Sequence, residues 1–247
     1  MKVTFRLYEV GGKVRDELLG LKSKDVDYSV VLSSTDNWTA QEGFDWFEAQ
    51  LVKGGYEIFL ATPECYTIRA KFPKEHKYSG VADFVLARHE TGYFDGTRRP
   101  VVTLGTLEED MLRRDFTVNA LARDEFGGIT DYFNGREDLK YRILQTPGDP
   151  AKSFQDDPLR IIRGIRFCIT KGFTFSREVR LAIREHGIHG LEVVSQERIR
   201  EELYKCFKYD TVKTWKYLNF MENHLNFPII EYAFRDTGLW LEPTNKL

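Results

Sequence analysis

The sequence predicts an α+β fold in which a mixed head of strands and helices precedes a region made of helices. The first observation is that strand-like and helix-like segments alternate along the first 141 residues. The second is that the segments after residue 142 follow a helical periodicity, with no convincing strand among them. We therefore expect a head at 1–141, a helical neck at 142–209 and a short helical body at 210–247.

The head elements follow from local patterns. Helices are expected at 14–19 and 39–53, each ending at a glycine. Another helix begins near Thr106, because Thr106 and Glu109 have the spacing of a capping box. Strand-like composition marks five segments: 2–10, 25–32, 56–61, 66–72 and 80–88.

Beyond the head, four segments have helical periodicity: 157–171, 177–186, 196–207 and 211–225. Pro158 fits the first helical position of the first segment, and Asp157 fits the N-cap before it.

The charge distribution is uneven although the net charge is only −2. Residues 1–150 carry 20 Lys and Arg against 25 Asp and Glu, whereas residues 151–216 carry 14 against 9. An acidic first part and a basic middle suit a metal site beside a surface that meets polyanions. Charges on solvated helix faces would give the same distribution, so both interpretations stay open.

Other features favour a cytoplasmic protein without a membrane span. No apolar run approaches the roughly 18–20 residues that a membrane helix requires. The first residues lack the continuous apolar stretch of a secretory signal. The three cysteines are odd in number and widely spaced, which fits a reducing compartment better than a disulfide framework.

Two aspartates stand two residues apart in the predicted strand at 25–32. Residues at this spacing share one face of a strand, so Asp25 and Asp27 would point the same way at close range. Their like charges repel, and a hard divalent cation such as Mg²⁺ resolves the conflict. The alternative is an edge strand with both carboxylates in water, which the apolar residues that follow disfavour.

A third aspartate lies in an apolar strand-like segment. Six of the seven residues from 81 to 87 are apolar, and Asp83 is the exception. An unpaired charge in a buried strand is costly. Asp83 therefore either faces Asp25 and Asp27 across a metal or pairs with an arginine such as Arg88.

Two further segments suit phosphate binding. Gly11 and Gly12 join a strand to a helix, where backbone N–H groups can approach an anion, and Arg15 follows one turn later. Arg113 or Arg114 could clamp a triphosphate, with Asp115 accepting from a ribose hydroxyl. Both segments also fit ordinary structural roles as a turn and as charges at a helix end.

Asp157 and Arg160 are three residues apart on one helix face. An aspartate accepts hydrogen bonds and an arginine donates them. Together they match the pairing edge of cytosine or adenine, which offers an amine donor and a ring-nitrogen acceptor. Guanine and uracil present the opposite polarity, so this pair would select C and A without a template.

Taken together, the chain resembles the bacterial-type family of tRNA nucleotidyltransferases and poly(A) polymerases. The resemblance runs from Gly11 to about Leu203. Six ordered motifs carry it: GGKVRD with KDVD, ADFVLAR, RRDFTVNALA, DYFNGREDL, DDPLRIIRGIRF and ERIREEL.

The resemblance implies a DNA polymerase beta-like head with a mixed sheet, followed by a helical neck and body. It implies that Asp25 and Asp27 hold the metal ions and that Asp83 is the third catalytic acid. About 40 residues follow the last motif, so the body and tail typical of the family would be shortened. The nucleotide-binding residues implied by the motifs are Gly11, Gly12, Arg15, Arg114, Asp115, Asn119, Asp157, Arg160 and Arg163.

The implied activity is the addition of CMP and AMP to the 3′ end of tRNA from CTP and ATP, with two Mg²⁺ ions, or Mn²⁺ in their place. Addition of A alone, poly(A) synthesis and an RNA-binding module without turnover are the alternatives. The last segment, 227–247, is apolar enough to pack, and oligomerisation through it is one expectation.

Overall fold

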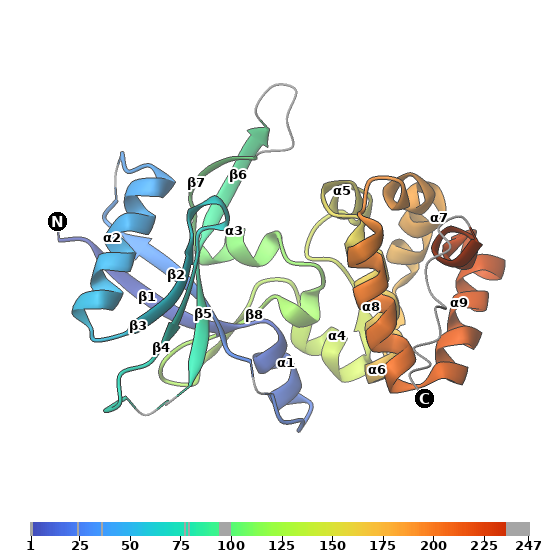
Figure 1. Ribbon diagram of the computed structural model, residues 1–247, viewed down its shortest axis with the longest axis horizontal. Coiled ribbons are helices and arrows are strands. Elements are labelled where there is room, and N and C mark those ends of the chain that lie inside the picture. The colour runs from blue at the N-terminus through green and yellow to red at the C-terminus, as the bar shows by residue number, and fades with distance from the viewer. Residues whose placement is uncertain are drawn as a thin grey trace, which may run out of the picture. The chain divides into compact units, whose positions relative to one another are not determined.

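The computed structural model describes residues 2–23, 25–35, 37–76, 78, 80–93 and 100–235. The chain divides into two compact units, which we call the head unit (Met1–Leu139) and the helical unit (Lys140–Leu247) (Figure 1). The three-part division expected from the sequence stays a prediction.

The head unit contains a seven-stranded sheet with the order β3-β4-β5-β2-β1-β8-β9. The pairing of β2 with β5 is parallel and the other pairings are antiparallel, so the predicted α+β class with a mixed sheet is confirmed. The strands are β1 (Thr4–Val10), β2 (Asp27–Ser33), β3 (Glu57–Thr62), β4 (Thr67–Lys71), β5 (Val81–Leu86), β8 (Leu121–Arg123) and β9 (Ile129–Asp131).

Helices and one further strand pair complete the head unit. Strands β6 and β7 form an antiparallel pair apart from the main sheet. The capping box expected at Thr106 is present, with reciprocal hydrogen bonds to Glu109. The elements are α1 (Gly12–Leu18), α2 (Ala40–Lys53), η1 (Pro63–Cys65), β6 (Arg88–Tyr93), β7 (Pro100–Leu104), α3 (Leu107–Leu112), η2 (Thr117–Asn119) and α4 (Gly135–Tyr141).

The two faces of the sheet have different environments. Tyr28 and Phe84 lie opposite each other in β2 and β5 and belong to a buried cluster that includes Phe47 of α2. Successive strand residues point to opposite faces, so Asp27 and Asp83 point away from α2. One face of the sheet is therefore buried under α2, and the two aspartates lie on the other face, beside a second buried cluster that includes Val10 and Met111.

In the helical unit, α6 packs between α7, α8 and α9 and buries its apolar face. The expectation of no strand here was wrong, because the two-residue strands β10 and β11 form a parallel pair. No helix of the described part is long and apolar enough to cross a membrane. The elements are β10 (Ile143–Leu144), α5 (Pro150–Asp156), α6 (Leu159–Lys171), β11 (Thr174–Phe175), α7 (Arg177–Leu191), α8 (Gln196–Tyr209), α9 (Thr211–Leu225) and η3 (Glu231–Arg235).

The start of α6 and the last segment of the chain can be compared with the sequence expectations. Helix α6 begins at Leu159, with Pro158 rather than Asp157 at the N-cap. Pro158 nevertheless has helical backbone angles (φ −63°, ψ −19°), and Asp157 Oδ1 accepts from the backbone N–H of Leu159 at 3.3 Å, as an N-cap side chain does. The described part of the last segment packs within the unit, since Phe227 and Ile229 are fully buried, while residues 236–247 lie outside the described ranges.

Candidate active site

Three carboxylates lie near one end of β2. Asp27 is the first residue of that strand and is paired in register with Asp83 across the parallel β2–β5 ladder. Asp25 lies in the irregular segment before the strand and is exposed, so the prediction of a strand beginning at Asp25 was wrong by two residues. The pairing of β2 with β1 ends at Val10 and Asp27. Asp25 therefore has no strand partner in β1, and β2 begins at Asp27.

Asp83 forms an ion pair with an arginine, which was one of the two expectations for this residue. The arginine is Arg69 and not Arg88. Its Nε and Nη2 donate to the two carboxylate oxygens of Asp83 at 2.8 and 2.9 Å. Arg88 instead donates from Nη1 to the carbonyl oxygen of Cys65 at 2.6 Å. Within the described ranges, no group of three His, Cys, Asp or Glu side chains is arranged to hold a metal ion.

The electrostatic environment of Asp27 nevertheless fits a cation. Burial raises the pKa of Asp27, the neighbouring Asp83 and Asp25 raise it further, and Arg114 and Arg69 oppose them. The net direction is upward, so the negative charge of Asp27 is incompletely compensated by the protein. A divalent ion held by two carboxylates and substrate oxygens would supply the missing positive charge, and the Asp25 and Asp27 oxygens suit Mg²⁺.

Gly11 brings the backbone against two predicted site residues. Its φ is 72°, a conformation that favours glycine. A Cβ at this position would lie 3.1 Å from Arg114 Nη1 and 3.7 Å from Asp27 Oδ2. Arg114 Nε is buried without a hydrogen-bond partner among the described residues. The structure therefore brings Gly11, Asp27 and Arg114 together, as an anion site beside a metal would need.

Three other predicted nucleotide-binding residues form a buried network. Arg15 Nη1 donates to Asn119 Oδ1 at 2.5 Å, and Asn119 Nδ2 donates to Asp115 Oδ1 at 2.8 Å. Each of the three is less than 10% exposed. Gly12 adjoins the network, since a Cβ there would lie 3.5 Å from Arg15 Nη2. The network ties α1, which follows the glycine turn, to η2, and the sequence did not reveal this connection.

Asp110 is a site residue that the sequence reasoning missed. It is 1% exposed and contacts both predicted arginines, with Oδ1 at 2.9 Å from Arg113 Nε and Oδ2 at 3.2 Å from Arg114 Nη2. Burial raises the pKa of Asp110, but Arg114 and Arg113 together bring it below its usual range. The sequence signal is the spacing of three and four residues between one acid and two arginines.

We expect Asp110→Asn to destabilise the head unit by about 3 kcal/mol at neutral pH, because it leaves two arginines beside an uncharged amide. The lowered pKa means that the carboxylate stabilises the fold above its unfolded pKa of about 4 and loses that effect as the pH falls through the folded value. Urea unfolding of both proteins from pH 7 to pH 3 should show the difference shrinking below about pH 4. A difference that grows on acidification would contradict this role.

The residues predicted to recognise the base lie in the helical unit. Arg160 Nη1 donates to Ser153 Oγ at 2.7 Å, and Asp157 Oδ2 lies 3.8 Å from Arg198 Nη2. Asp157 Oδ1 also accepts from the backbone N–H of Leu159 at 3.3 Å. Arg163 lies three residues beyond Arg160 in α6 and is half-buried. Their role in selecting a base stays a prediction.

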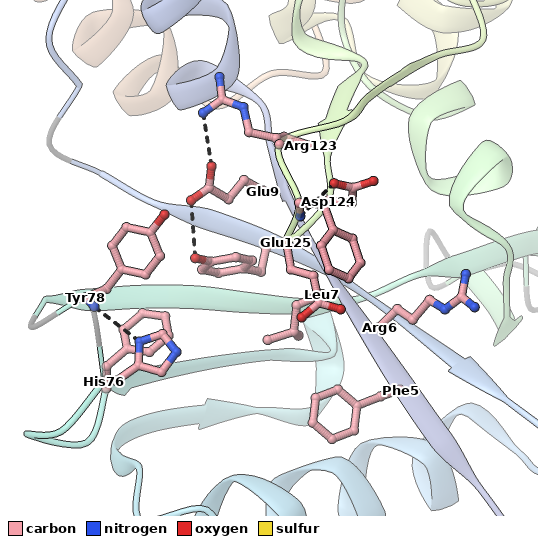
Figure 2. Close-up of a pocket in the computed structure, with 13 residues that line it drawn as sticks. Phe5, Arg6, Leu7, Glu9, His76, Tyr78, Arg123, Asp124 and Glu125 are labelled. Atoms are coloured by element: carbon pink, nitrogen blue, oxygen red, sulfur yellow. Dashed lines mark hydrogen bonds and ion pairs between the residues drawn. The ribbon is translucent and has the colours of Figure 1, made fainter.

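A pocket of about 440 Å³ lies on the opposite face of the sheet from Asp27 (Figure 2). Its floor includes Glu9 and Tyr28, whose side chains are joined by a hydrogen bond of 3.4 Å. Figure 2 shows Arg123 beside Glu9, with Tyr78 and His76 at the other side. Because Tyr28 and Asp27 point to opposite faces, this pocket is separate from the carboxylates.

Two protein-family models match parts of this chain. Residues 7–145 match the family model for the "Poly A polymerase head domain". Residues 172–218 match a second model, "Probable RNA and SrmB- binding site of polymerase A". The first match spans the glycine turn, the three carboxylates, Asp110 and Arg114.

Relatives and solved structures agree with these matches. A CCA-adding enzyme of Lactobacillus helveticus is 38% identical over 203 residues, covering 81% of this chain and 46% of that enzyme. One from Anoxybacillus flavithermus is 43% identical over 128 residues, covering 51% of this chain and 32% of that enzyme. The chain thus spans between about a third and a half of the length of these two relatives.

Among solved structures, the Bacillus stearothermophilus CCA-adding enzyme in complex with CTP has a TM-score of 0.70 at 29% identity, covering 92% of this chain and 49% of that one. A tRNA nucleotidyltransferase complexed with a primer tRNA and an incoming ATP analogue has a TM-score of 0.69 at 28% identity, covering 94% and 60%. The head-domain model matches more than half of the chain. This chain therefore belongs to the poly(A) polymerase head-domain family, the bacterial-type family of tRNA nucleotidyltransferases and poly(A) polymerases.

Proposed function

We propose that this protein adds CMP and AMP to the 3′ end of tRNA, using CTP and ATP without a nucleic-acid template. The observation that carries the proposal is the meeting of Asp27 with Gly11 and Arg114 in a head domain of this family. Solved relatives bind CTP, or a primer tRNA with an ATP analogue, which supports the substrate assignment.

The reaction is the attack of an RNA 3′-hydroxyl on the α-phosphate of the nucleotide, with release of pyrophosphate. Asp25 and Asp27 would hold two Mg²⁺ ions, or Mn²⁺, which polarise the phosphate oxygens and favour ionisation of the hydroxyl. Arg114 and the backbone of Gly11 and Gly12 bind the triphosphate and orient it for in-line attack. Catalysis is then mainly positioning and electrostatic stabilisation.

The buried network behind the glycine turn holds this arrangement in place. Arg15 fixes Asn119, and Asn119 fixes Asp115, so the turn and η2 keep one relative position. We infer that Asp115 and Asn119 set the position of the sugar.

Base selection is assigned to Asp157 and Arg160. An acceptor and a donor match the pairing edges of cytosine and adenine and mismatch those of guanine and uracil. Arg160 is half-buried, and its Nη1 donates to Ser153 Oγ at 2.7 Å, which fixes the side chain in the free protein.

We expect Arg160→Ala to blur nucleotide choice more than it slows incorporation, because the metal and phosphate contacts remain. Competition among all four nucleoside triphosphates should show about tenfold more GMP and UMP incorporation relative to CMP and AMP. Arg177→Ala is the matched control, since Arg177 is an exposed arginine of the same unit outside the motif. Unchanged selectivity in Arg160→Ala would refute the assignment.

Two alternatives predict other products. An A-adding enzyme or a poly(A) polymerase of the same family would incorporate AMP alone, and the product length separates one residue from many. A non-catalytic RNA-binding module would bind nucleotide with metal but incorporate nothing. Labelled CTP and a tRNA transcript that lacks its CCA end decide the proposal, because incorporation supports it and its absence contradicts it.

The cellular setting is the cytoplasm, where tRNA and nucleotides are available. All three cysteines are free thiols in the structure, and Cys168 and Cys206 are buried. A reducing compartment fits that state.

A further inference from the structure

Asp83 already forms an ion pair with a cationic side chain of the protein, that of Arg69. Arg69 of β4, Asp83 of β5 and Asp27 of β2 lie in one row across three neighbouring strands. Residues directly opposite each other in a sheet share a face, so the guanidinium and the two carboxylates are close neighbours. The row therefore runs from one positive charge at Arg69 to two negative charges at Asp83 and Asp27, the last of which belongs to the predicted metal site.

The geometry of the pair opposes direct metal ligation by Asp83. Two parallel N–H groups of Arg69 occupy both carboxylate oxygens at 2.8 and 2.9 Å. Such a fork is the strongest arrangement that arginine makes with a carboxylate. A divalent ion on the same oxygens would stand beside the guanidinium, and the two positive charges would repel.

The Arg69 side chain is nevertheless largely exposed to solvent. It is 56% exposed, against 27% for Asp83. Its neighbour across β3 is Leu60, an exposed residue that offers no charge. Asp83 is the ion-pair partner that the structure records for Arg69, so displacing the guanidinium would cost one exposed pair.

We infer that Arg69 is a positioning residue that occupies Asp83 in the free protein and gives it up when metal and nucleotide arrive together. The inference rests on the proposed function, because it assumes that Asp25 and Asp27 hold the metal. Arg69 keeps Asp83 oriented while the site is empty and weakens the binding of metal alone. The nucleotide would arrive with its own metal ion, and its triphosphate is an anion to which the Arg69 guanidinium can transfer. Asp83 would then be available beside Asp25 and Asp27.

The test is a titration of Mn²⁺ without nucleotide, read from the electron paramagnetic resonance signal of the free ion. Arg69→Gln removes the charge and should bind Mn²⁺ about fivefold more tightly than the unaltered protein. Lys71→Gln is the matched control. Lys71 lies two residues along the same strand, and its partner at 3.8 Å is Glu57 rather than a site carboxylate, so its affinity should not change.

A second background isolates the pair. With Asp83→Asn present, adding Arg69→Gln should raise Mn²⁺ affinity by clearly less than fivefold, because the contact with Asp83 is already lost and only the weaker influence of the Arg69 charge on Asp27 is removed. Equal or weaker binding in Arg69→Gln alone would overturn the inference. Asp27→Asn in the same titration tests the proposed metal site separately: if it binds Mn²⁺ as the unaltered protein does, or if no protein binds the ion, the site itself is refuted.

Discussion

Asp27→Asn is expected to lower nucleotide incorporation by about a thousandfold or more while the protein stays folded. The substitution removes a carboxylate that we assign to the metal, and several kcal/mol of transition-state stabilisation correspond to about this factor. Single-turnover incorporation of labelled CTP into tRNA, with saturating Mg²⁺, measures the loss directly.

The same variant should be as stable as the unaltered protein, or more so. Burial and two neighbouring carboxylates raise the pKa of Asp27, which means that its ionised form is disfavoured in the fold. An uncharged amide of the same shape removes that cost. Asp45→Asn, an exposed position on α2, is the control and should retain full activity. Turnover by Asp27→Asn within tenfold of the control would contradict the metal assignment.

Gly135→Ala is expected to destabilise the head unit by about 3 kcal/mol or more. A Cβ at this position would lie 2.1 Å from the carbonyl oxygen of Thr117 and 3.1 Å from a methyl group of Leu121. The clash is with backbone, so a side-chain rotation cannot relieve it. Helix α4 would have to move away from η2, whose Asn119 holds Arg15 in the site.

Thermal unfolding compares this variant with Gly80→Ala. A Cβ at Gly80 would meet nothing within 4 Å, so that control should lie within about 0.5 kcal/mol of the unaltered protein. Equal unfolding temperatures for the two variants would show that the close approach of α4 to Thr117 is wrong.

Local signals predicted much of this fold because they act over a few residues. Helices α2 and α3 begin where Thr39 and Thr106 make their capping boxes. Helix α5 carries an equally local signal that the sequence analysis overlooked, since Asp149 caps it and Pro150 occupies its first turn. Strands of two or three residues, such as β8 and β10, are too short for an alternating pattern to reveal.

The structure brings the predicted residues Gly11, Asp27 and Arg114 together, but the sequence did not show which side chains pair with each other. The spacing of Asp25 and Asp27 predicted a metal site on one strand, and that site stays a prediction, but the strand begins only where β1 is available for pairing. The charge of Asp83 required a partner, and the sequence suggested Arg88 because it is near in the chain. In the folded sheet, the register of β4 against β5 places Arg69 directly opposite Asp83. Such pairings depend on the sheet, which local patterns do not encode.

Template-independent CCA addition is tested most directly by sequencing the products formed from tRNA transcripts that end before CCA, after C and after CC, with CTP, ATP and Mg²⁺ present. We expect each transcript to be completed to CCA, in order, with no further addition. Addition of A alone, continued addition of A, or no addition to any transcript would contradict it.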